Sequence, residues 1–168
     1  SFRTAVRQVA AERGVRLAKW LGDGVMMIGV EQEDLVEAVI DIEYLVDESR
    51  SPLPMRAGIA RGRVLLIDGD DHVGSAVILA SRLCDRAKPH QILAQADTVS
   101  LEMVNAVEIR LGEHDVPGFA DRIEIVQLTS PGGHRGTVTA PTLGADEGFT
   151  PFEASVAAVL AALRPGEV

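Results

Sequence analysis

The strongest constraint on the fold is a pair of apolar segments that a tight turn separates. Residues 15–22 have the sequence VRLAKWLG, residues 25–30 have the sequence VMMIGV, and Gly-Asp-Gly occupies positions 22–24 between them. An Asp-Gly pair between two apolar runs is typical of a β-hairpin. Because a hairpin forces antiparallel pairing, the sequence favours an α+β fold over a doubly wound parallel sheet.

The rest of the chain mixes helical and strand patterns. Apolar residues recur at helical spacing and predict helices at 2–13, 32–48, 74–87 and 97–103. Strands are expected at 55–62, 63–69, 91–94, 106–111 and 122–128, and a polar loop at 70–72. The sequence therefore predicts a folded domain of mixed strands and helices at 1–128.

The C-terminal part has a different composition. Residues 129–150 are rich in Gly, Pro and Thr, which predicts an irregular arm. The Ala-rich segment 151–164 begins at a proline and is followed by another at position 165, as helices often are. We expect an arm and a C-terminal helix over residues 129–168.

Charge and cysteine content exclude several classes of function. The 168-residue chain has a net charge of −9, and nucleic-acid-binding proteins usually present basic surfaces, so no nucleic acid partner is expected. Its single cysteine, Cys84, excludes an internal disulfide and fits a reducing compartment. No apolar run reaches the roughly 18 residues of a membrane span, and no signal peptide opens the chain. The sequence predicts a soluble, cytoplasmic protein.

Two short segments carry residues that suit chemistry. In the hairpin, Lys19 precedes Asp23 by four positions, and a turn carboxylate can hold a hard cation through oxygen. Further along, Asp71 precedes a predicted helix that carries Arg82. Taken singly, each set also fits a structural role: a surface lysine with a turn aspartate, and a helix-capping acid with a solvated arginine. The four histidines have no metal-ligand spacing and are expected at the surface.

Together the segments resemble one family. KWLGDGVM, PMRAGIARGRV, DHVGSAVILASRLCDRA and QILA follow one another like the sequence blocks of class III adenylyl and guanylyl cyclases of the bacterial type. The resemblance covers residues 1–128. It implies a ferredoxin-like antiparallel sheet with helices packed on it. It also implies a homodimer whose active sites lie at the interface, so that Asp23 and Arg82 of one site come from different chains.

The resemblance assigns roles to individual residues. It makes Lys19 and Asp71 the pair that reads the base, in the adenylyl pattern, and Asp23 a ligand of Mg²⁺ or Mn²⁺. It makes Arg82 the group that stabilises charge at the phosphate. The implied reaction converts ATP to cyclic AMP and pyrophosphate by two-metal catalysis: the ribose 3′-OH attacks the α-phosphorus and pyrophosphate leaves.

The chain also departs from the family pattern. Ile78 stands where the family has an asparagine that orients the ribose. The family's first metal-binding aspartate lies on a central strand before the first helix, whereas this chain starts at or just before that helix, so we expect the sheet to lack its first central strand. Three hypotheses remain: an adenylyl cyclase of full or weak activity, a degenerate nucleotide-binding or dimerising regulatory module, and an unrelated α+β binding domain.

Overall fold

The computed structural model describes residues 1–22, 24–29, 31–49, 54–67, 71–96, 98 and 106–130, and the backbone of 156–162. The helices are α1 (Phe2–Arg13), α2 (Gln32–Glu48) and α3 (Ser75–Arg86). The strands are β1 (Arg16–Leu21), β2 (Gly24–Gly29), β3 (Met55–Arg61), β4 (Leu65–Ile67), β5 (Asp71–Val73), β6 (Ile92–Gln95), β7 (Val107–His114), β8 (Ile123–Thr129) and β9 (Val156–Ala162).

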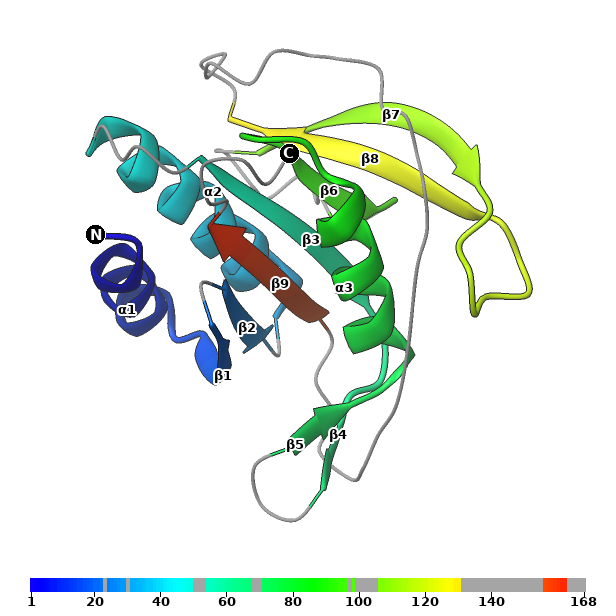
Figure 1. Cartoon of the computed structure of the whole chain (residues 1–168), viewed down its shortest axis with the longest axis horizontal. Coiled ribbons are helices and arrows are strands. Elements are labelled where there is room, and N and C mark those ends of the chain that lie inside the picture. Colours follow the sequence, from blue (N-terminus) through cyan, green and yellow to red (C-terminus); the bar gives the residue numbers. More distant parts are fainter. Residues whose placement is uncertain are drawn as a thin grey trace.

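Seven strands form one sheet in the order β1-β2-β9-β3-β6-β8-β7, and β4 pairs with β5 in a separate ribbon. The pairs are antiparallel except for β3 with β6. In Figure 1, α1 and α2 cover one face of the sheet and α3 lies across the other, while the β4–β5 ribbon projects beyond the end of α3. The α+β fold with helices packed on a largely antiparallel sheet is confirmed.

The apolar residues divide into two cores, one on each face of the sheet. Along β2, Val25 and Met27 pack with α1 and α2, whereas Met26 and Ile28 pack on the α3 side. Strands β3, β6 and β8 show the same alternation, as expected for a sheet with both faces covered. Among the described residues, no helix is both long and apolar enough to cross a membrane.

Local signals in the sequence set the ends of α1. The hydroxyl of Ser1 accepts a hydrogen bond from the backbone N–H of Thr4, and Gly14 ends the helix with a φ of 67°. In the last turn, Arg13 bridges to Glu37 and Asp41 on α2. Burial alone would lower the pKa of Arg13, but hydrogen bonds and charge attraction from the two carboxylates outweigh it, so the pKa lies above its ordinary value.

Helix α3 packs directly on the backbone of β3 at Gly58. A Cβ atom at this position would lie 2.0 Å from the carbonyl oxygen of Ala80 and 2.4 Å from the backbone nitrogen of Cys84. Any side chain would therefore push the helix away from the sheet. The glycine fixes the distance between the sheet and the helix that carries Ile78 and Arg82.

The C-terminal segment differs most from expectation. The predicted helix at 151–164 is wrong over Val156–Ala162, which form β9 between β2 and β3, antiparallel to both. Alanine favours a helix, but in this position the strand pairs on both edges, and it covers the edges that β2 and β3 would otherwise leave unpaired. The central gap that the sequence predicts is thus filled by a strand from the other end of the chain.

Two smaller predictions are also corrected. The expected polar loop at 70–72 is a strand over Asp71–Val73, because β4 supplies an antiparallel partner. His72, expected at the surface, is buried with 7% exposure, since alternation along β5 turns it inward. The predicted helix at 97–103 lies outside the described residues, except for Thr98. The irregular arm was predicted at 129–150, but Thr129 belongs to β8, and residues 131–150 lie outside the described part of the chain. The domain division at residue 128 stays a prediction.

The place of β9 can be tested by disulfide trapping. Met27 and Ala158 are Cα partners on adjacent antiparallel strands, a separation that a disulfide can span. With Cys84 replaced by serine, we expect Met27→Cys with Ala158→Cys to oxidise almost completely under mild conditions, as measured by thiol counting with mass spectrometry. The control pairs Met27→Cys with Ala161→Cys, which lies about 10 Å further along the strand. Equal trapping of both pairs would contradict the register.

Candidate active site

An irregularity in β1 determines which way Lys19 points. The ladder between β1 and β2 shifts between Leu17 and Lys19, so that Ala18 is an extra residue on β1. Ala18 packs with the core on the α3 side, whereas Trp20 packs with the core on the α1 and α2 side. In a regular strand, residues two positions apart face the same side of the sheet. Ala18 and Trp20 face opposite sides because the bulge adds one residue to the strand at this point. Lys19 consequently lies on the α3 side of the sheet.

The predicted base-reading residues meet in space. The Nζ atom of Lys19 lies 3.5 Å from Oδ1 of Asp71, although the two residues are 52 positions apart. Their side chains are 53% and 65% exposed. An ion pair with this exposure contributes little to stability, because water screens it. Hydrogen bonds from a ligand to Lys19 and Asp71 could therefore replace this contact with little loss of stability.

The β4–β5 ribbon holds Asp71 at the surface. Asp71 pairs with Ile67 across the ribbon, and the next residue, His72, points inward. The ribbon packs against α3 through β5. Because a two-stranded ribbon is marginal by itself, burial of His72 and the contact with α3 are what fix the position of Asp71.

Helix α3 presents Ile78 and Arg82 on its less buried face. The two residues are four positions apart, which places them one above the other, and both are half-buried. The opposite face carries Leu79, Leu83 and Cys84, which are buried in the α3-side core. Gly74 is the N-cap residue before α3, and its carbonyl accepts a hydrogen bond from the N–H of Ile78 at 3.1 Å. Arg82, the predicted phosphate-binding residue, and Ile78, which departs from the family pattern, therefore lie on the same surface of α3.

The hairpin turn is described except for its central residue, Asp23. Leu21 pairs with Gly24, which confirms the hairpin, while Asp23 itself lies outside the described residues. Among the described residues, no group of three His, Cys, Asp or Glu side chains could hold a metal ion.

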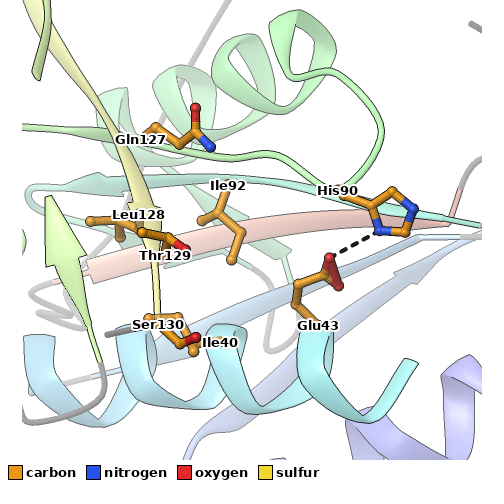
Figure 2. A pocket seen from close by; sticks show the side chains of 8 residues that line it. All are labelled: Ile40, Glu43, His90, Ile92, Gln127, Leu128, Thr129 and Ser130. Atoms are coloured by element: carbon orange, nitrogen blue, oxygen red, sulfur yellow. Dashed lines mark hydrogen bonds and ion pairs between the residues drawn. The ribbon is translucent and has the colours of Figure 1, made fainter. Parts of the chain in front are cut away.

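Two polar contacts near the start of β6, one on each face of the sheet, were not predicted from the sequence. On the α2 side, His90 Nδ1 lies 3.1 Å from a carboxylate oxygen of Glu43. On the α3 side, Gln91 donates to Gln127 at 3.1 Å with both side chains buried. Figure 2 shows the Glu43–His90 contact beside a small pocket. The pocket is lined by Ile40, Glu43, His90, Ile92, Gln127, Leu128, Thr129 and Ser130.

This pocket is not a nucleotide site. Its volume is about 20 Å³, which holds about one water molecule. It also opens on the side of α2, whereas Lys19 and Asp71 lie on the side of α3. The one signal for it in the sequence is the Lys-Pro-His turn, where His90 adopts a φ of 63°, rare for a residue with a side chain.

The fold is shared with solved structures of nucleotide cyclases. An adenylate/guanylate cyclase/hydrolase from Silicibacter pomeroyi matches with a TM-score of 0.67 at 23% identity, over 77% of this chain and 80% of that chain. The adenylyl cyclase CyaB from P. aeruginosa matches with a TM-score of 0.63 at 22% identity, over 77% of this chain and 79% of its own. The chain therefore has the fold of the class III adenylate and guanylate cyclases.

Similar sequences occur in mycobacteria. Uncharacterized proteins of Mycobacterium tuberculosis and Mycobacterium bovis are each 42% identical over 95 residues, which is 56% of this chain and 25% of theirs. A pH-sensitive adenylate cyclase of Mycobacterium tuberculosis is 33% identical over 90 residues, 54% of this chain and 22% of its own. The matched segment thus spans about a quarter of these relatives. No family model matches the chain.

Proposed function

We propose that the chain is an adenylate cyclase homology domain that binds ATP and converts it slowly to cyclic AMP and pyrophosphate. The observation that carries the proposal is the contact between Lys19 and Asp71 on the α3 side of a cyclase fold. A lysine offers only donors and an aspartate only acceptors, so the pair can meet both kinds of group on the edge of a base. The resemblance of the two segments to the adenylyl pattern selects adenine.

The chain's own residues would share the work of binding and charge stabilisation. Lys19 and Asp71 would hold the base, which fixes the nucleotide on the α3 side. Arg82 would stabilise negative charge at the phosphates as the 3′-OH attacks, and preorganised charge of this kind is often a large catalytic contribution. We also propose that the site would hold Mg²⁺ or Mn²⁺ with Asp23 as one ligand, because carboxylate oxygen suits a hard cation.

A second candidate function is binding without turnover. Ile78 lies four residues before Arg82 on the same half-buried surface, and an isoleucine offers no donor or acceptor to a ribose. A domain with this residue could still bind the nucleotide through Lys19, Asp71 and Arg82. It would then serve as a nucleotide-binding or dimerising regulatory module.

Base reading can be tested by calorimetry with ATP and GTP. We expect Lys19→Met or Asp71→Asn to weaken ATP binding by about tenfold, as loss of a hydrogen bond to a charged group does. We expect the preference for ATP over GTP to fall as well. Lys88→Met is the matched control, because Lys88 is the only other lysine of the chain and lies in the turn after α3. If Lys88→Met weakens binding equally, the effect is one of net charge and the proposed base contact is wrong.

The residue at position 78 should separate catalysis from binding. We expect Ile78→Asn to raise cyclic AMP formation from ATP with Mn²⁺ or Mg²⁺ by about tenfold or more, because a side chain that orients a reacting group acts through geometry. ATP affinity should change less. Ile78→Val, which stays apolar, should leave turnover unchanged. Absence of both turnover and nucleotide binding in every variant would overturn the proposed function.

The proposal includes a symmetric dimer, because the resemblance places residues of one site on two chains. We expect size-exclusion chromatography with light scattering to give about twice the mass of the chain at tens of micromolar. A monomer across that range would contradict a preformed site.

A further inference from the structure

The end of β1 that carries Lys19 has little support from the sheet. Strand β1 lies at the edge of the seven-stranded sheet and pairs only with β2 among the described strands. The bulge at Ala18 interrupts that single ladder just before Lys19. An edge strand with an interrupted ladder is expected to open more readily than a central strand. Something besides the sheet must therefore hold Lys19 against Asp71.

Arg3 of α1 supplies this support from the opposite face. Its guanidinium lies 4.4 Å from the centre of the Trp20 ring, and its Nη2 atom donates a hydrogen bond to the carbonyl of Gly22 at 3.2 Å. One side chain thus holds the residue that follows Lys19 and the first residue of the hairpin turn. In Figure 1, α1 lies beside the β1 end of the sheet, so the contact ties the edge strand to a helix that packs on the core.

We propose that Arg3 is a positioning residue for the base-reading lysine: it clamps Trp20 and Gly22 so that Lys19 stays within reach of Asp71. The inference rests on the proposed function, in which Lys19 and Asp71 read adenine. Arg3 touches no part of a nucleotide in this arrangement, because it lies on the α1 side of β1 and Lys19 on the α3 side. Its effect passes through the Trp20 side chain, which follows Lys19, and through the backbone carbonyl of Gly22.

Arg7 provides a matched control. It lies one turn further along α1, is exposed like Arg3 and approaches the same ring at 5.5 Å. Among the described residues, the hydrogen bond to Gly22 comes from Arg3 and not from Arg7. Replacing either arginine by glutamine removes one positive charge and one cation–π contact. Only the change at Arg3 releases the turn.

The experiment measures the Lys19–Asp71 contact directly. A water-soluble carbodiimide converts a carboxylate to an O-acylisourea, and a neighbouring amine attacks its acyl carbon to form an amide and release the urea. Applied to the whole chain, it should join Lys19 to Asp71, and mass spectrometry of the digest gives the yield. We expect Arg3→Gln to lower this yield about threefold or more, the size of effect that loss of one hydrogen bond produces. Arg7→Gln should stay near the wild-type yield, and Arg3→Lys should fall between the two.

Two outcomes would overturn the inference: an unchanged yield in Arg3→Gln, or an equal fall in Arg3→Gln and Arg7→Gln. Melting curves should show that all variants are folded at the temperature of the reaction, so a lower yield reports position and not unfolding. A second readout is the ratio of ATP to GTP binding, which should fall in Arg3→Gln and hold in Arg7→Gln. If the wild-type chain binds no nucleotide, the proposed function fails, while the amide yield still decides whether Arg3 positions Lys19.

Discussion

The ladders of backbone hydrogen bonds on the two edges of β9 are the contacts that join the sheet into one piece. On one side of β9 lie β2 and then β1, the strand that carries Lys19. On the other side lie β3, β6, β8 and β7. Within the sheet, β9 is the only described strand that links these parts. Asp71 and Arg82 belong to elements that follow β3 and pack on its side. The distance between Lys19 and Asp71 therefore depends on a strand that contributes no residue to the candidate site.

Patterns in the sequence predicted most of the individual elements because their causes are local. The Gly-Asp-Gly turn predicted the hairpin, and the periodicity of 32–48 gave bounds that α2 matches. The strand β9 could not be predicted in this way. Its alanines favour a helix, and only the two open edges of β2 and β3, which are far away in the sequence, make a strand the better choice. The same holds for β5, whose partner β4 decides its structure.

The candidate site was predicted less completely than the fold. The resemblance pairs Lys19 with Asp71 as base readers, and the structure places the two side chains in contact. Periodicity alone would have put Lys19 on the wrong face, because the bulge at Ala18 has no sequence signal that we recognised. The clamp by Arg3 was missed for a related reason. A helix pattern shows which residues are exposed, but it does not show that an exposed arginine reaches a carbonyl 19 residues away.

The surface of α3 shows how fold and function can separate in such a domain. The fold constrains the buried face strongly, since Gly58 brings the helix backbone against β3 and Leu79, Leu83 and Cys84 fill the core. Position 78 lies on the other face and is half-buried, so the polar atoms of an asparagine there would keep access to water. Exchanging isoleucine for asparagine therefore costs the fold little. A ligand that needs a hydrogen bond from position 78 does not receive one from isoleucine, although the cyclase fold stays intact.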